Sequence, residues 1–575
     1  MNDRYITLRA NLHHYKGNHC YEVKLEDLDG IWFCTRKNSK RILKNLERAG
    51  QLKYQPGRGR GNASQITYPI EFQQEMDTYI EECVNRGDLE SIAQVLRVPI
   101  PEQWVMNFSL EIRQLLGLKR DETVSRDVLH TFRARDITTL DPLRVSVSLE
   151  THLIEYLGDT LVRYNREDDC FDPHIAHHFD VANNNRIWTF YLRKAVAFHH
   201  GGIVTSRDIA HTINRMKNSQ HSYSWLARNI TKIKCSHPYK VEIHLAEPNP
   251  FFLRYLSAPH FCILPEDIEF NEYQWIGTGP FRLKERTEHK LVLMANDVYF
   301  KERPLIDEIH FYKVTHEAAK IVYLSNKEEV DKIEPRKHKI KDAGIRLLSF
   351  NLLRSNVVKQ HSFREAIYHI FNVRKMAKEL EWEVLEARSF EIEKAGPQLR
   401  DLSKIPYLLK ISGYKGEALN LYHFVNQHAV VEAEWLKKEA SKYEILLNLH
   451  PITFQEFTEN GTEHDIDLLI MGLSLSFDKH LAFSYAFRNK ALLFNRLFDR
   501  KIDRYIQEML TAFELTEERT RRDEIMEEME QYLQKEHAII FLYHPIVTRA
   551  LDPIIQDVES NSFGHLDFRK LWVRS

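Results

Sequence analysis

The sequence lacks the features that mark exported and membrane proteins. No window approaches the roughly 20 consecutive apolar residues that cross a bilayer. The first residues, MNDRYITLRANLHHYKGN, show no apolar stretch followed by a small-residue cleavage site. The six cysteines form no C-x-x-C pair, which favours reduced thiols in the cytosol over a disulfide framework. We therefore expect a cytoplasmic protein with no membrane partner.

Catalytic signatures are also missing. The chain contains no G-x-S-x-G elbow, no H-E-x-x-H helix and no dinucleotide fingerprint. The segment 277–280 (GTGP) lacks the Lys-Ser/Thr of a phosphate loop and is interpreted as a tight turn. The adjacent histidines of 199–202 (HHGG) favour a bend over a metal site. The sequence thus predicts no enzyme activity, no cofactor and no metal.

Charge is balanced over the whole chain but uneven along it. The formal net charge is -2, from 80 Lys and Arg against 82 Asp and Glu. Residues 1–70 alone hold thirteen Lys and Arg against six Asp and Glu. A basic excess confined to one small segment is typical of a nucleic-acid-binding domain, although a merely solvated basic surface is the alternative.

The same segment carries the pattern of a winged helix-turn-helix. Apolar residues at helical spacing predict two helices within residues 5–32, and a third helix begins after Thr35 and ends at Gly50. Residues 52–55 and 65–68 are predicted as hairpin strands around the tip PGRGRGNAS. The third helix would enter the major groove of double-stranded DNA. Candidate DNA contacts are Arg36, Lys37, Lys40, Arg41 and Lys44 of that helix, and Arg58 and Arg60 of the tip.

Residues 71–116 are predicted to form a helical connector. The stretch EFQQEMDTYIEECVNRGDLESIAQVL is acidic and helix-forming, and Pro99 and Pro101 then interrupt it before FSLEIRQLL. A semi-rigid connector could transmit a motion, whereas a passive spacer is the alternative.

The remainder of the chain resembles a known receptor family. Strands such as KLVLMA and VEIHLA between amphipathic helices indicate α/β lobes. IWTFYLRKAVAFHHGGIVTSRDIAHTINRM, WIGTGPFRLKERTEHKLVLMANDVYFKERPLIDEIHFYKV and FREAIYHIFNVRKM follow in order and resemble segments of family 5 solute-binding proteins, the receptors of oligopeptide, dipeptide and nickel ABC transporters. With a winged helix in front, the order of domains resembles the SgrR-type regulators, a family of cytoplasmic transcription factors.

This resemblance implies a multidomain α/β chain, with an N-terminal winged helix (α+β) followed by a two-lobed periplasmic-binding-protein-like domain of type II with an extra lobe. The implied boundaries are 1–70 for the winged helix, 71–116 for the connector and 117–575 for the ligand-sensing domain. Within the last, lobe I would comprise 117–169, 277–348 and 540–575, the extra lobe 170–276, and lobe II 349–539.

The resemblance also implies where a ligand binds. In the family it lies beside the loop after the first strand, which here corresponds to residues 148–152, and touches the second lobe. The candidate contacts are Glu150, His152, Tyr223, Trp225, Ser474, Ser476 and Asp478. Peptide receptors carry W-x-A-D-Y in this second region, but here Leu473 and Ser476 stand at the Trp and Asp positions. A small polar solute such as a sugar, a sugar phosphate or an oligopeptide is therefore expected.

The implied function is a DNA-binding transcription regulator in which solute-driven closure of the lobes about a hinge alters DNA binding. Two alternatives remain. The chain could be the solute receptor of an ABC transporter acting in uptake, or a DNA-binding protein whose receptor domain has lost its ligand. The oligomeric state and the operator are not predicted.

Overall fold

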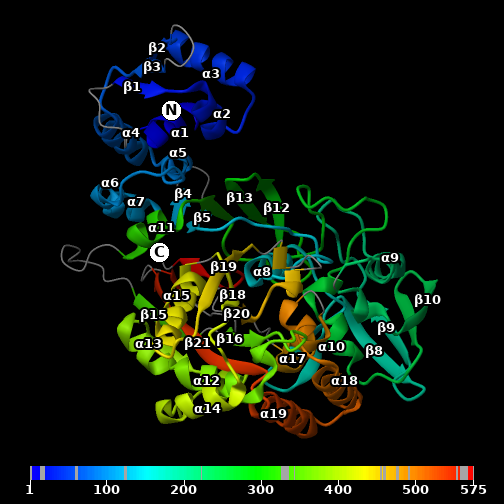
Figure 1. Cartoon of the computed structure of the whole chain (residues 1–575). Coiled ribbons are helices and arrows are strands. Elements are labelled where there is room, and N and C mark those ends of the chain that lie inside the picture. The colour runs from blue at the N-terminus through cyan, green and yellow to red at the C-terminus, as the bar shows by residue number, and fades with distance from the viewer. Residues whose placement is uncertain are drawn as a thin grey trace.

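The computed structural model describes residues 3–12, 20–57, 63–121, 126–221, 223–324, 336–341, 344–425, 427–453, 456–457, 462–473, 478–489, 492–551, 555–556 and 567–573. An N-terminal module lies at one end of the molecule, a group of short helices follows, and a large α/β part forms the rest (Figure 1). None of the helices in these ranges is both long enough and apolar enough to cross a bilayer.

The N-terminal module is a winged helix. Its elements are α1 (Asp3–Leu12), β1 (Cys20–Val23), α2 (Leu25–Ile31), α3 (Arg36–Arg48), β2 (Lys53–Gln55) and β3 (Ser64–Thr67). The three strands form an antiparallel sheet in the order β1-β3-β2. Leu8, Trp32, Leu43 and Ile66 fill a core between the helices and the sheet. The predicted helices and hairpin strands are present, and β1 was not predicted because only Val23 of its four residues is buried.

The connector is helical and packs against both of its neighbours. It consists of α4 (Phe72–Arg86), α5 (Leu89–Val95), α6 (Glu102–Asn107) and α7 (Ser109–Leu115). One apolar core contains buried residues of all four helices, together with residues of α1 and of α11 (His316–Leu324). Helix α1 therefore contributes to two cores. Leu8 and Leu12 pack in the core of the winged helix, and Ile6 and Ala10 pack in the core of the connector.

Lobe I of the large part is built on a five-stranded sheet with the order β12-β13-β14-β5-β4. Its strands are β4 (Gly117–Asp121), β5 (Arg126–Arg133), β12 (Phe281–Arg286), β13 (Lys290–Ala295) and β14 (Glu308–Lys313). Strands β5 and β14 are parallel, and the other neighbours are antiparallel. Helix α8 (Ser148–Leu157) packs on this sheet, with Tyr156 against Phe281 in the shared core.

The extra lobe lies between two segments of lobe I in the sequence. It contains β6 (Val162–Asn165), β7 (Cys170–Pro173), β8 (Ala176–Ala182), β9 (Ile187–Leu192), β10 (Ile230–His237) and β11 (Lys240–Leu245), with α9 (Ser206–Lys217) and α10 (Phe252–Leu256). Four of the strands form an antiparallel sheet in the order β10-β11-β9-β8, and β6 pairs with β7.

Lobe II is built on a seven-stranded sheet with the order β15-β21-β16-β20-β18-β19, to which β17 adds by pairing with β21. The strands are β15 (Arg336–Lys341), β16 (Ile345–Phe350), β17 (Val384–Glu386), β18 (Leu419–Phe424), β19 (Leu447–Ile452), β20 (Leu468–Leu473) and β21 (Ile539–Leu551). The helices are α12 (His361–Ile370), α13 (Val373–Glu379), α14 (Ile405–Ser412), α15 (Gln427–Ser441), α17 (Lys479–Arg488), α18 (Arg500–Leu515) and α19 (Arg519–Lys535).

Three lobe boundaries differ from those expected. Strand β6 was expected in lobe I but pairs with β7 of the extra lobe. Strand β21 pairs with β15 and β16, and β16 also pairs with β20, so residues 336–341, 345–348 and 540–551 belong to the sheet of lobe II. Near the end of the chain, Phe568 and Leu571 join the core of lobe I. A short pair, β22 (Ile555–Gln556) and β23 (Trp572–Val573), lies in this last stretch.

Candidate functional site

Helix α3 presents a basic surface to solvent. It buries Ser39, Leu43 and Leu46 in the core of the winged helix. The side chains of the opposite face are exposed, among them Lys37, Lys40, Arg41 and Lys44. Contacts to DNA phosphates require positively charged side chains that are exposed and able to reach them.

Arg36 differs from the other candidates on α3. Its guanidinium lies 3.2 Å from Glu26 and 3.3 Å from Asp29 of α2, and these hydrogen bonds raise its pKa. The charge is therefore already balanced within the module, and Arg36 is better placed to fix α3 against α2 than to bind phosphate. Arg58 and Arg60 of the predicted wing lie outside the described residues.

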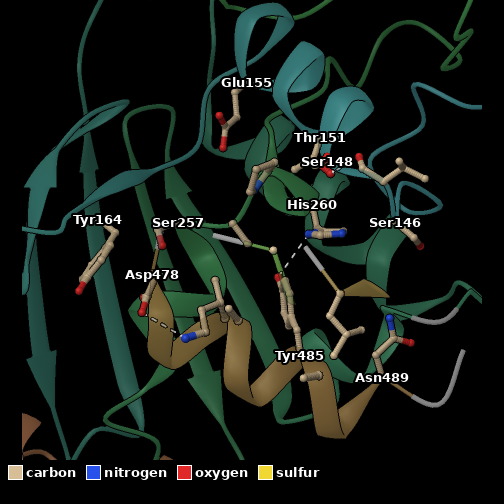
Figure 2. Close-up of a pocket in the computed structure, with 18 of the residues that line it drawn as sticks. Ser146, Ser148, Thr151, Glu155, Tyr164, Ser257, His260, Asp478, Tyr485 and Asn489 are labelled. Atoms are coloured by element: carbon tan, nitrogen blue, oxygen red, sulfur yellow. Dashed lines mark hydrogen bonds between the residues drawn. The ribbon is translucent and has the colours of Figure 1, made fainter. Parts of the chain in front are cut away.

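A second candidate site is a cavity of about 980 Å³ between the lobes. Lobe I, the extra lobe and lobe II all contribute to its wall (Figure 2). Polar and aromatic side chains that line it include Ser146, Ser148, Thr151 and Glu155 of lobe I, Tyr223, Ser257 and His260 of the extra lobe, and Arg346, Phe424, Asp478, Tyr485 and Asn489 of lobe II.

The first turns of α8 form the lobe I wall. Ser148, Thr151 and Glu155 are spaced i, i+3 and i+7, so they share the face that lines the cavity. Glu150 and His152 do not line it. Glu150 is fully buried and accepts hydrogen bonds from Arg135 and from the backbone N–H of Thr138, and the buried His152 ring lies 2.7 Å from the Tyr156 hydroxyl.

The structure therefore places the two ligand contacts predicted in this segment, Glu150 and His152, away from the cavity. The prediction took residues 148–152 as the loop after the first strand, beside which the family's ligand lies. The segment is instead the start of α8, and helical geometry turns Glu150 and His152 toward the interior of lobe I. The helical spacing of Ser148, Thr151 and Glu155 was the pattern in the sequence that could have identified this wall.

The remaining predicted contacts fall in different places. Tyr223 lines the cavity, with its hydroxyl 3.3 Å from that of Ser146. Trp225 is half-buried outside the lining and packs edge-on against Tyr255 and Tyr485. Ser474 and Ser476 lie outside the described residues.

Asp478 lines the cavity, but protein partners occupy its carboxylate. One oxygen accepts hydrogen bonds from the backbone N–H groups of His480 and Leu481 at the start of α17. The same oxygen lies 2.5 Å from the guanidinium of Arg254 in the extra lobe, which also pairs with Asp169. Asp478 and Arg254 are 4% and 3% exposed in their side chains, so this is a buried ion pair that joins lobe II to the extra lobe.

Most of the cavity residues were not predicted, among them His260, Arg346 and Tyr485. The hydroxyl of Tyr485 on α17 lies 3.2 Å from Nδ1 of His260 in the extra lobe, and the dashed line in Figure 2 marks this bond. Arg346 at the start of β16 is held by Glu432, which also accepts a hydrogen bond from Tyr543. Each contact joins residues more than 80 positions apart, and no local sequence pattern identifies such pairs.

His260 should make the folded protein less stable in acid. Burial lowers the pKa of His260 to about 4, whereas the unfolded side chain titrates near 6.5. As the pH falls, the unfolded chain therefore binds this proton at a higher pH than the folded protein does. The free energy of unfolding falls as the pH falls from 6.5 toward 4. Between pH 7 and pH 5, we expect the wild type to lose about 2 kcal/mol more unfolding free energy than His260→Gln. Denaturant titrations at the two pH values measure this, and equal losses would contradict it.

The GTGP segment shapes the edge of the cavity by close packing. A Cβ atom on Gly277 or Gly279 would lie 2.3 or 2.2 Å from backbone carbonyl oxygens at the end of α8. Thr278 donates a hydrogen bond to Asp159, a cavity residue whose pKa His174 and Arg163 hold well below its usual range despite the opposing effect of burial. These contacts agree with the interpretation of the segment as a structural turn.

Two family models cover most of the chain. Residues 171–492, more than half of the chain, match bacterial extracellular solute-binding proteins, family 5 (middle). Residues 1–108 match the N-terminal domain of the sugar transport-related sRNA regulators.

Individual relatives agree with these matches. The uncharacterized protein YhjP of Bacillus subtilis is 24% identical over 570 residues, which is 96% of each chain. The HTH-type transcriptional regulator SgrR of Photorhabdus laumondii is 28% identical over 316 residues, so the alignment spans about half of each protein (54% of both). A dipeptide binding protein of Pseudoalteromonas sp. SM9913, solved with Met-Leu, shares the fold over 78% of this chain and 100% of its own, with 17% identity and a TM-score of 0.67. The chain belongs to the family 5 solute-binding proteins, joined to the N-terminal domain of an SgrR-type regulator.

Proposed function

We propose that this protein is a cytoplasmic transcription regulator that binds duplex DNA through α3 and its wing and senses a small polar solute in the interlobe cavity. One observation carries the proposal: a continuous apolar core runs from α1 of the winged helix through the connector to α11, β5 and β14 of lobe I. A DNA-binding module that packs on lobe I in this way moves together with lobe I.

The winged helix is fixed to the connector through Arg9. This arginine of α1 is 2% exposed, lies 3.2 Å from Glu75 of α4 and donates a hydrogen bond to the carbonyl of Ile70. Its guanidinium also stacks 4.0 Å from the centre of the Tyr68 ring. The hydroxyl of Tyr5 donates to the same Glu75 carboxylate at 2.9 Å. Buried charge, hydrogen bonds and aromatic packing together disfavour independent rotation of the module.

The connector is fixed to lobe I in turn. Arg113 of α7 donates a 2.7 Å hydrogen bond to the carbonyl of Val322 in α11, and the backbone N–H of Thr315 donates to the carbonyl of Leu96. Glu90 of α5 pairs with Lys290 of β13 at 2.7 Å. Lobe I, the connector and the winged helix would therefore move as one body when lobe II closes over a solute. A bound solute would then favour some positions of the winged helix relative to lobe II over others, and so alter DNA binding.

The cavity has the size and lining for a small polar solute. Ligand pockets commonly enclose roughly 300–1,000 Å³. Serine and threonine side chains of α8 line it together with tyrosine and phenylalanine rings, which suits hydrogen bonding to a sugar, a sugar phosphate or a short peptide. Asp478 is already paired with Arg254, which argues against that carboxylate as an anchor for a peptide amino terminus.

Uptake of solute as a transport receptor is the second candidate, because the large part shares its fold with a dipeptide binding protein. An experiment on the full chain separates the two. Sugars, sugar phosphates and dipeptides are first screened for a rise in melting temperature, which reports binding to the native state. Affinity for fragments of the source genome is then measured with and without each stabilising compound. If the protein is a regulator, it binds DNA and a stabilising compound changes its DNA affinity. If it is a transport receptor, a compound stabilises it but it does not bind DNA.

A further inference from the structure

Helix α2 ends on an exposed phenylalanine in an unusual backbone conformation. Phe33 has a φ of +47° and is 95% exposed. Its N–H donates to the carbonyl of Gly30, and the N–H of Cys34 donates to the carbonyl of Asp29. These two bonds define a Schellman ending, in which the residue at the position of Phe33 is left-handed and is usually glycine.

Other left-handed helix ends of this chain do not expose an apolar side chain. Among the ends that the structure describes, three use glycine, two use an exposed glutamate, and one uses a histidine whose ring packs on neighbouring rings. The glycines are Gly50 (α3), Gly87 (α4) and Gly413 (α14), the glutamates are Glu381 (α13) and Glu444 (α15), and the histidine is His537 (α19). Phe33 alone in this group combines the left-handed backbone with an exposed apolar ring. Both features are unfavourable in the free protein, and strain that folding does not require is typical of a functional position.

The position of Phe33 favours DNA over other partners. It lies three residues before Arg36, where α3 begins, and the N-terminal residues of a recognition helix are the ones that reach base edges. Lys37 and Arg41 are exposed on the same half of α3. The major groove carries one apolar group, the methyl of thymine, and phenylalanine is among the side chains that contact it.

We propose that Phe33 makes an apolar contact with thymine methyl groups in the major groove of duplex DNA and adds base preference to the phosphate contacts of α3. The proposal rests on the proposed function, because it requires that α3 enters the groove. The left-handed turn holds the ring out of the core of the module, so the aromatic surface is available to the groove without rearrangement.

The first experiment compares Phe33→Gly with Glu381→Gly in the full chain. Both substitutions relieve a left-handed backbone and should raise the melting temperature. Only Phe33→Gly should weaken binding to a duplex that the wild type has selected from a random-sequence pool, by about tenfold. Phe33→Asn, which tolerates the same backbone, should weaken it similarly. Unchanged affinity in the stabilised Phe33→Gly variant would overturn the proposal.

The second experiment removes the methyl groups from the DNA. Replacing thymine by uracil in the selected duplex should weaken wild-type binding several-fold and leave Phe33→Gly binding unchanged, since the contact is already lost. Equal losses for the two proteins would overturn the proposal. So would a change in sedimentation of Phe33→Gly without a change in DNA affinity, because the ring would then belong to a contact between copies. If the wild type selects no duplex at low salt, the proposed function itself fails.

Discussion

Replacing Lys37, Arg41 and Lys44 together by alanine is expected to weaken binding of the full chain to duplex DNA by about two to three orders of magnitude at low salt. Each of these side chains is exposed on α3, opposite the face that packs on the core. Three lost phosphate contacts should also reduce the slope of log affinity against log salt by about 2.7, because fewer counterions are released. Fluorescence anisotropy titrations at several salt concentrations measure both effects.

The matched control removes the same charge elsewhere. Lys410, Lys437 and Lys438 are exposed on helices of lobe II, and alanine at these three positions lowers the net charge equally. The control should alter DNA affinity only slightly, because charges beyond the Debye length of roughly 10 Å from the DNA are screened. If the two triple variants bind DNA with the same affinity and salt slope, α3 is not the DNA-binding surface.

The second large effect concerns the contact between the extra lobe and lobe II. Asp478→Ala is expected to lower the free energy of unfolding by about 3–5 kcal/mol, because it leaves the buried Arg254 without one of its two carboxylate partners. The same change removes the N-cap of α17, which adds about 1 kcal/mol. Guanidinium unfolding followed by tryptophan fluorescence measures the loss.

An exposed ion pair provides the comparison. Arg166, in the turn between β6 and β7, lies 3.1 Å from Glu393 of lobe II, and these side chains are 59% and 63% exposed. Glu393→Ala should therefore cost less than about 1 kcal/mol. A loss for Asp478→Ala no greater than that for Glu393→Ala would mean that the buried pair does not hold the two lobes together.

Local pattern predicted the three helices and the hairpin strands of the winged helix, but not β1. The third helix follows from the spacing of its apolar residues, from Thr35 before it and from Gly50, whose φ of +73° matches the role of a helix-terminating glycine. Its basic face follows from the same periodicity. The pairing of Arg36 with Glu26 and Asp29 could not be predicted, because it depends on how α2 and α3 cross.

The cavity was harder to predict because its wall combines residues that are distant in the sequence. The resemblance placed the lobes and directed attention to residues 148–152, but assigning contacts there required knowing that the segment is helical. Tyr485 and His260 lie 225 positions apart, and their meeting depends on how the extra lobe and lobe II pack. The predicted lobe boundary near residue 540 was misplaced for a similar reason. The long strand β21 pairs with β15, β16 and β17 of lobe II, and these pairings join residues that are distant in the sequence.

In the proposed regulator, a solute bound between the lobes changes the affinity of the winged helix for DNA. The most direct test measures the affinity of the full chain for one selected duplex, with and without a saturating compound that raises its melting temperature. Coupling through the connector predicts a change of at least about fivefold. Identical affinities in the two conditions, with the compound shown to be bound, would contradict the account.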